Sequence, residues 1–401
     1  MIWASPRAIN GNRGDIASRF GILAGFAKHG ARFSVILAAR PDHVPELLRP
    51  QVIQNGPLYN LWPGFAGLRA LRRARAVAWC AGLDLQDDSS RAKLVHLWLL
   101  FAFYRLLGLR IMLVFQGAGP LTTHSGRWLA RRVTSLVELA LIRDSGSFHL
   151  LEQFVEPKRL RLAADGIFLE GFPTRDALGA CPAPILALTN ASGRPVIGIN
   201  LRLWFHFTNS WLPHQFATRA SHRRAQHKRE ALVESMTEVV AHLRRHHRAR
   251  VVLISMYEPR SEPWEDDCPL LMQLKSRFVD DPEVVLWQED VPIEDLFRLF
   301  GRLDLMIGMR LHSALIAMRA GVPAIHLAYT LKGRDIYADL GLREWAIELE
   351  EVSRAPAAVT RVADAVLADP DRFARVATLT TRIVAENQRA LCDAIRSFED
   401  Q

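Results

Sequence analysis

A cation and an imidazole lie between two apolar segments in the stretch DLMIGMRLHSALIAMRAGVPAIHL, residues 304–327. Residues 303–309 form an apolar run that predicts a buried strand, and an apolar helix is expected from 311 to 320. Arg310 and His312 therefore fall at the amino end of a helix. Free backbone N–H groups and the helix dipole favour an anion at that position.

The types of these two side chains indicate chemistry on a phosphate or a carboxylate. Arg310 could bind such an anion and His312 could protonate it. A purely structural alternative is equally open, in which Arg310 pairs with a nearby acid such as Asp304 or Asp335. Lys332 follows the next strand, in a predicted loop, and could add a second cation at the same sheet edge.

Two more cations are expected at the same predicted cleft. Arg143 lies in IRDSGS (142–147), and Arg202 ends the strand INLRLW (199–204). Each arginine alone is more often a salt-bridge partner. Several cations at the carboxyl ends of strands around one cleft instead favour an anionic ligand.

A glycine-rich turn opens the first predicted helix in the stretch 10–30. Gly11 and Gly14 permit tight turns, and Asn12 and Asp15 are suited to capping the helix. The stretch has neither the GxGxxG pattern nor the GxxxxGK[ST] pattern, so it is a weak nucleotide signature. We expect it to be a loop that opens into a cleft.

The whole chain of 401 residues carries a formal net charge of +9, which suits anionic partners. A dense basic run at 219–230 is expected to be a solvated loop leading into a helix, with an anionic acceptor or lipid surface as the alternative. No standard nucleic-acid module is present, so no nucleic-acid partner is expected. No clustered metal ligands are apparent, and the four cysteines lack CxxC spacing.

The most apolar segment, 94–115, is interrupted by Arg105, Gly108 and Arg110. It predicts a buried helix to about Leu107 and then a buried strand rather than a membrane span. With no signal peptide visible, we expect a cytoplasmic protein, either free or at the inner face of the membrane. Peripheral membrane contact is an open alternative.

Short apolar runs alternate with helical patterns along the chain, which predicts an α/β fold with doubly wound parallel sheets. The expected strands are 33–38, 76–82, 111–117, 195–201, 250–256, 283–287, 303–309 and 323–328. The expected helices are 15–29, 91–107, 127–141, 228–247, 293–300, 311–320 and 371–397. A linker rich in Pro, Gly and Ala at 170–194 divides them. We therefore expect two domains, 1–175 and 190–365, followed by a C-terminal helix in 370–401.

With these motifs in view, the chain resembles the polysaccharide pyruvyl transferase family. The fullest match is 304–342, where a strand ends in RLH and is followed by an apolar helix, G-x-P, a strand and Y-x-x-K. Shorter matches occur in order: GNRGD (11–15), AGLDLQDD (81–88), QGAGPL (116–121), IRDSGS (142–147), AADG (163–166) and INLR (199–202).

The resemblance implies two Rossmann-like domains of the glycosyltransferase-B type, with the C-terminal helix packing back on the first domain. It also implies transfer of a pyruvyl group from phosphoenolpyruvate, a co-substrate, to a free or lipid-linked saccharide, with no further cofactor. His312 would be the acid/base, while Arg310, Lys332 and Arg143 would hold the donor. The GNRGD turn would face the cleft.

Two other functions are open for the same architecture. One is a glycosyltransferase that uses a nucleotide sugar, although no pocket for a base and ribose can be located in the sequence. The other is a non-catalytic family member that binds polysaccharide or organises a synthesis complex at the membrane. In that case Arg310, His312 and Lys332 would not converge.

Overall fold

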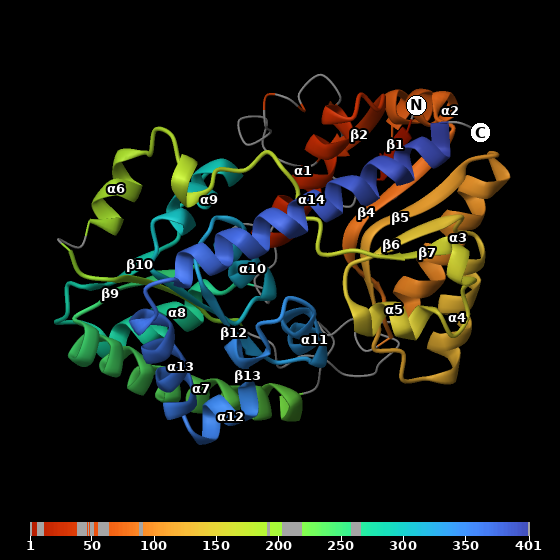
Figure 1. Cartoon of the computed structure of the whole chain (residues 1–401). Coiled ribbons are helices and arrows are strands. Elements are labelled where there is room, and N and C mark those ends of the chain that lie inside the picture. The colour runs from red at the N-terminus through yellow and green to blue at the C-terminus, as the bar shows by residue number, and fades with distance from the viewer. Residues whose placement is uncertain are drawn as a thin grey trace.

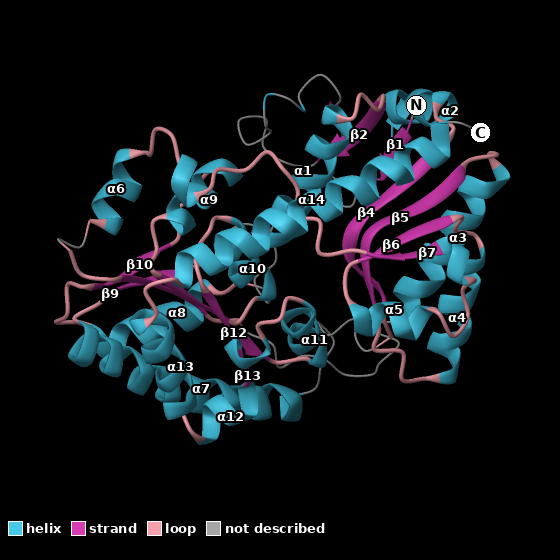
Figure 2. Cartoon of the chain, in the orientation of Figure 1, coloured by secondary structure: helices cyan, strands magenta, loops and turns pink. Residues whose placement is uncertain are grey.

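The computed structural model describes residues 2–5, 12–37, 46, 48, 52–54, 64–87, 91–190, 193–202, 219–257 and 266–399. These residues form two lobes, each built on a parallel β-sheet flanked by helices (Figures 1 and 2). Strands covered on both sides must be apolar on both faces, which explains the unbroken apolar runs of the sequence. The fold is therefore of the α/β class, with two parallel sheets.

The N-terminal sheet has the strand order β3-β2-β1-β4-β5-β6-β7. Its strands are β1 (Ile2–Ser5), β2 (Phe33–Leu37), β3 (Val52–Gln54), β4 (Ala76–Leu85), β5 (Arg110–Ala118), β6 (Leu139–Ile142) and β7 (Leu160–Leu162). Its helices are α1 (Arg13–Lys28), α2 (Gly64–Arg73), α3 (Arg91–Leu106), α4 (His124–Ser135) and α5 (Ser145–Leu151), with a 3-10 turn at Pro157–Arg159. Right-handed crossovers place α1 on one face and α2 to α5 on the other.

The C-terminal sheet has the order β10-β9-β8-β11-β12-β13. Its strands are β8 (Val196–Asn200), β9 (Arg250–Ile254), β10 (Val284–Trp287), β11 (Leu305–Gly308), β12 (Ala324–Ala328) and β13 (Ala346–Glu348). The helices after β7 are α6 (Ala183–Thr189), α7 (Arg219–His247), α8 (Cys268–Lys275), α9 (Ile293–Gly301), α10 (Leu311–Arg319), α11 (Leu331–Asp339), α12 (Leu349–Arg354), α13 (Ala357–Ala368) and α14 (Arg372–Glu399). Short 3-10 helices occur at Arg175–Ala177, Ser276–Phe278 and Arg343–Trp345.

The long helix α14 leaves the C-terminal lobe and crosses to the N-terminal one, as Figure 1 shows. Ile383, Leu391 and Phe398 along it are buried in the core that it shares with α1 and the C-terminal sheet. Near its end, the guanidinium of Arg110 lies 4.3 Å from the ring centre of Phe398. The expected packing of the C-terminal helix on the first domain is confirmed.

Several local expectations are wrong. Lys332 lies in helix α11, not in a loop, because Ile336, Tyr337 and Leu340 are buried at helical spacing. The basic run 219–230 belongs to helix α7 rather than to a loop. The predicted helix 127–141 ends at Ser135, and its last residues enter the buried strand β6.

Candidate active site

The amino ends of α1 and α10 meet where the two lobes face each other. Asn12 caps α1 by accepting a hydrogen bond from the backbone N–H of Gly14, at 3.0 Å. A methyl carbon added to Gly14 would lie 2.1 Å from Cβ of His312 in the first turn of α10. Only glycine allows this approach, so Gly14 is required by the contact between the two helices. Gly11, in the same motif, lies outside the described residues.

Residues near Asn12 also contact the C-terminal lobe. Asn12 forms an antiparallel bridge with Tyr257, and the backbone N–H of Arg13 donates to the carbonyl of Met256 at 3.1 Å. The Arg13 guanidinium lies 5.3 Å from the ring centre of Trp287. The start of α1 therefore lies against the carboxyl ends of β9 and β10.

Two carboxylates flank the imidazole of His312. Its Nε2 lies 3.5 Å from Oδ2 of Asp165, and its Nδ1 lies 3.8 Å from Oδ1 of Asp15. The His312 side chain is only 12% exposed, and that of Asp165 is fully buried, whereas Asp15 is 39% exposed. The closer and better shielded partner is thus Asp165.

Asp165 is held as a carboxylate by several donors. Arg143 Nη1 and Ser18 Oγ each donate to it at 2.9 Å, and the backbone N–H of Ile167 donates at 3.0 Å. Burial favours its neutral form, but the charges of His312 and Arg143 and these hydrogen bonds hold the pKa of Asp165 well below its usual range. A fixed negative charge therefore lies beside His312.

The loop that carries Asp165 is anchored by Asn387 of α14. Asn387 Oδ1 accepts from the backbone N–H of Ala164 at 2.9 Å. Its Nδ2 donates to the carbonyls of Asp165 and Phe168, at 2.9 and 3.1 Å. Because Asn387 is 1% exposed, these bonds are shielded from water and fix the loop firmly.

Arg310 is engaged differently from the anion-binding expectation. Its Nε lies 2.8 and 2.9 Å from the two carboxylate oxygens of Asp267, and its guanidinium lies 5.2 Å from the ring centre of Tyr257. Arg310 therefore does pair with an acid, but the acid is Asp267 rather than Asp304 or Asp335. Asp304 instead accepts the backbone N–H of Val196 at 2.9 Å.

The other predicted cations lie just beyond the carboxyl ends of strands. Arg202 Nη1 donates to the hydroxyl of Tyr329 at 2.5 Å, at the ends of β8 and β12. Lys332 lies in the first turn of α11, close enough to Asp335 to favour its ionised form. Burial and the charges of Asp144 and Asp339 nevertheless raise the pKa of Asp335. Arg143 is the predicted cation that shares a partner, Asp165, with His312.

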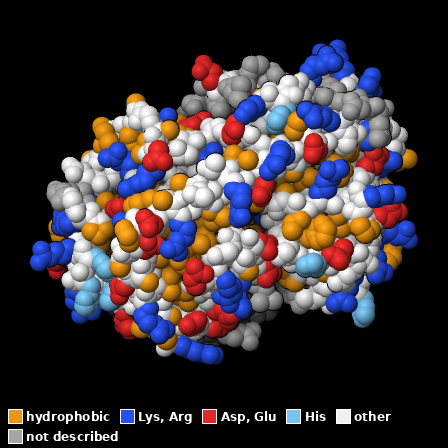
Figure 3. Space-filling view, viewed as in Figure 1, with side chains coloured by type: hydrophobic (Ala, Val, Ile, Leu, Met, Phe, Trp, Pro, Cys, Tyr) orange, Lys and Arg blue, Asp and Glu red, His pale blue; other side chains and the backbone are white. Residues whose placement is uncertain are grey.

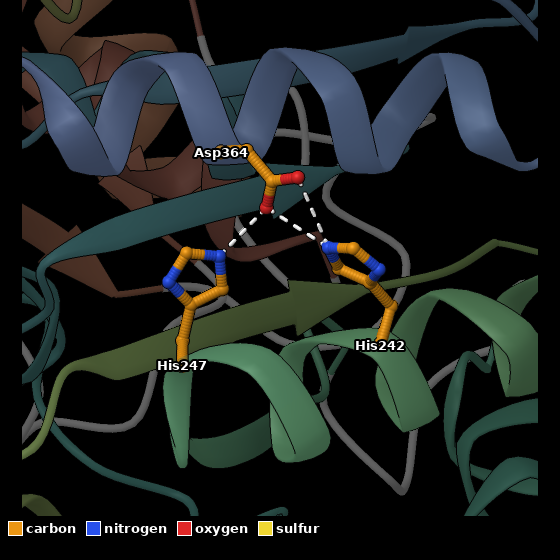
Figure 4. Close-up of side chains that lie close together, drawn as sticks. All are labelled: His242, His247 and Asp364. Carbon is orange, nitrogen blue, oxygen red and sulfur yellow. Dashed lines mark hydrogen bonds and ion pairs between the residues drawn. The ribbon is translucent and has the colours of Figure 1, made fainter.

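A second cluster, on the C-terminal lobe, offers potential metal ligands (Figure 4). His242 Nε2 and His247 Nε2 lie 2.9 and 2.6 Å from Oδ1 of Asp364, and the three ligand atoms lie within 4.8 Å of one another. Its members come from α7 and α13, and it was not apparent in the sequence because Asp364 is 117 residues from His247. Both imidazoles can donate to the same carboxylate, which explains the cluster as a link between the two helices without an ion.

Sequence reasoning missed the acids that position the two residues of the RLH motif. Asp165 lies in the AADG match, but nothing in its spacing relates it to His312, 147 residues later in the chain. Asp267, the partner of Arg310, follows the residues 258–265, which are outside the described part. A buried cation needs a buried anion, so a partner was predictable in kind but not in position.

Comparison with known proteins agrees with this architecture. The family model described as polysaccharide pyruvyl transferase matches residues 12–330. Among solved structures, a putative UDP-N-acetylglucosamine 2-epimerase from Listeria monocytogenes superposes with a TM-score of 0.62 at 12% identity, covering 100% of this chain and 97% of that one. Sucrose-phosphate synthase from Thermosynechococcus elongatus gives 0.59 at 12% identity, covering 100% and 98%. These structural likenesses show the glycosyltransferase-B fold alone.

Proposed function

This chain belongs to the polysaccharide pyruvyl transferase family, and we propose that it transfers a pyruvyl group from phosphoenolpyruvate to a sugar, forming a pyruvate ketal. Membership and fold together make it a transferase of polysaccharide modification. The observation that carries the finer proposal is the pairing of His312, at the amino end of α10, with the buried carboxylate of Asp165. Both residues lie within the part of the chain that the family model matches.

The proposed reaction needs a proton donor and a place for developing charge. His312 delivers a proton to the methylene carbon of phosphoenolpyruvate, and the adjacent carbon is attacked by one sugar hydroxyl. The bond from that carbon to the phosphate oxygen breaks, and phosphate leaves with the electron pair. Attack by a second hydroxyl of the sugar completes the ketal, and each hydroxyl gives up its proton to a base. Asp165 stabilises the protonated imidazole until that proton is transferred.

The donor carries a phosphate and a carboxylate, so its site needs cations and free N–H groups. In this proposal the amino end of α10 supplies the N–H groups. Lys332 and Arg202 supply charge at the ends of β12 and β8, and Arg143 keeps Asp165 ionised. Arg310, because it is paired with Asp267, serves to hold the strand end rather than the donor.

The donor assignment is tested first by thermal unfolding of the purified protein, titrated with phosphoenolpyruvate and separately with nucleotide sugars. We expect saturable stabilisation by phosphoenolpyruvate, equivalent to about 2.7 kcal/mol at a hundred times Kd. Lys332→Met should remove most of it, whereas Lys158→Met, at a side chain 80% exposed on the N-terminal lobe, should not. Stabilisation by a nucleotide sugar alone would contradict the proposal and favour the glycosyltransferase.

The catalytic assignment predicts a separation of binding from turnover. His312→Ala should lower phosphate release with a saccharide acceptor by about two or more orders of magnitude. The same variant should keep most of the thermal stabilisation by phosphoenolpyruvate, because the imidazole acts mainly in the transition state. Near-normal turnover in His312→Ala would rule out this role.

A further inference from the structure

The outer face of α3 is apolar although it faces solvent. Leu99, Phe103 and Leu106 follow one another at helical spacing and are 58%, 45% and 86% exposed. Trp128 on the neighbouring helix α4 is 49% exposed, and its ring centre lies 5.9 Å from that of Trp98. We name these four exposed residues, Leu99, Phe103, Leu106 and Trp128, the outer apolar surface.

The core does not explain this surface. The opposite side of α3 already supplies the residues that cover the sheet, since Leu94, Leu97 and Phe101 are 3% exposed or less. In Figure 1, α3 and α4 lie on the side of the N-terminal sheet that faces away from the C-terminal lobe. A helix with apolar residues on both faces has a second contact to make, and among the described residues neither lobe provides it.

Helices α3 and α4 carry basic residues and no acid, and Glu138, just beyond α4, pairs with Arg105 and Arg110. Residues 91–137, which include α3 and α4, contain no Asp or Glu and carry seven Lys and Arg residues. Arg127, Arg131 and Arg132 are exposed on α4, and the guanidinium of Arg132 lies 5.2 Å from the ring centre of Trp128. Helix α2 on the same face of the sheet likewise has arginines and no acid. The face of the molecule drawn in Figure 3 mixes both signs.

Aromatic and aliphatic side chains ringed by cations match the boundary of an anionic lipid layer. The apolar residues enter the boundary between headgroups and chains, while the arginines meet lipid phosphates. No helix of the described residues is long and apolar enough to cross a membrane, and α3 itself has 16 residues. We propose that the outer apolar surface and the arginines of α4 dock this protein on anionic phospholipid membranes.

The outer apolar surface lies away from the cleft, because Leu99, Phe103 and Leu106 belong to the second half of α3 (Arg91–Leu106). Helices α3 and α4 each begin beyond the carboxyl end of a strand, which is the sheet edge that carries Arg143. Arg91 Nη1 and Ser125 Oγ, at the starts of the two helices, are 3.3 Å apart. The docking itself does not depend on pyruvyl transfer.

Vesicle sedimentation tests the proposal on the full chain without any donor or acceptor. Vesicles of phosphatidylcholine with phosphatidylglycerol are compared with phosphatidylcholine alone. We expect binding to the anionic vesicles, reduced by at least about tenfold in Phe103→Ser/Leu106→Ser and in Arg131→Glu/Arg132→Glu. The matched controls are Met272→Ser/Val279→Ser, at side chains 52% and 73% exposed on the C-terminal lobe, and Arg382→Glu/Arg389→Glu, at two exposed arginines of α14.

Three results would overturn the proposal. The first is no binding of the wild-type chain to either vesicle. The second is equal binding to both vesicles that the arginine variant leaves unchanged. The third is a wild-type chain that does not bind vesicles but forms an oligomer in light scattering, which the variant Phe103→Ser/Leu106→Ser dissociates. The outer apolar surface would then be a protein interface. Each is distinct from failure of the donor assignment, which thermal titration measures separately.

Discussion

Asp165 is the residue that gives His312 its direction and its charge environment. Its carboxylate lies 3.5 Å from Nε2 and is fixed by Arg143 and Ser18. We predict that Asp165→Asn lowers kcat by about 10²-fold or more with a smaller change in KM for phosphoenolpyruvate. Turnover measured at a temperature where the variant is fully folded separates this loss from a loss of stability.

Asp15→Asn provides the comparison, since that carboxylate lies 3.8 Å from Nδ1 and is more exposed. Solvent screens it, so its removal should change turnover by less than Asp165→Asn does. If turnover fell equally in both variants, Asp165 would have no special role beside His312.

Positions that depend on neighbouring residues in the sequence were predictable. Contacts between residues far apart in the sequence were not. The position of His312 at a helix start follows from an apolar strand, a polar pair and an apolar helix in one stretch. The cap at Asn12 likewise needs only its neighbours. The partners Asp165 and Asp267 depend on which strand ends the topology brings together, and one sequence does not encode that by spacing. The role of Arg310 was therefore ambiguous until its partner was located.

At the scale of elements, α14 links the C-terminus to the site through Asn387. Replacing this residue by alanine leaves the N–H of Ala164 and two carbonyls without their buried partner. We predict that Asn387→Ala lowers the free energy of unfolding by about 2–4 kcal/mol in urea denaturation. It should also lower kcat at a temperature where the protein is fully folded, because the loop of Asp165 loosens.

The exposed neighbour Glu386→Ala is the matched control, with an expected change within about 0.5 kcal/mol. A variant Asn387→Ala that loses stability and yet turns over normally would show that the helix supports the fold and not the site.

Helices and strands with a strong apolar pattern were predicted well. Short elements, and the points where one element ends and the next begins, were not. The buried strands β5, β8 and β9 each contain an apolar run of four or five residues, which predicts a buried strand. Strand β6 has only four residues and continues the pattern of α4, so the sequence alone extends the helix through it. The sequence predicts a loop at the start of α11 because the first turn of this helix is polar. The helix nevertheless packs against β12 and β13.

At the scale of the whole molecule, one buried base should govern stability in mild acid. His326 lies in β12 at the centre of the C-terminal lobe, 1% exposed, with Nδ1 2.9 Å from the carbonyl oxygen of Gly308. Burial lowers the pKa of His326 from 6.5 to about 4, against the opposing effect of that hydrogen bond. Between these two values the unfolded chain binds a proton that the folded chain does not.

The contribution of His326 to the free energy of unfolding should therefore be fully present above pH 6.5. It should fall as the pH is lowered towards 4, with a limiting slope of about 1.4 kcal/mol per pH unit. We predict that His326→Asn, whose amide can still donate to Gly308, is less stable at pH 7.5 because it fills less volume. Its free energy of unfolding should nevertheless fall less between pH 7.5 and 5 than that of the wild type. His149→Asn, at a side chain 74% exposed, should keep the wild-type slope. An unchanged slope in His326→Asn would assign the acid sensitivity to other groups.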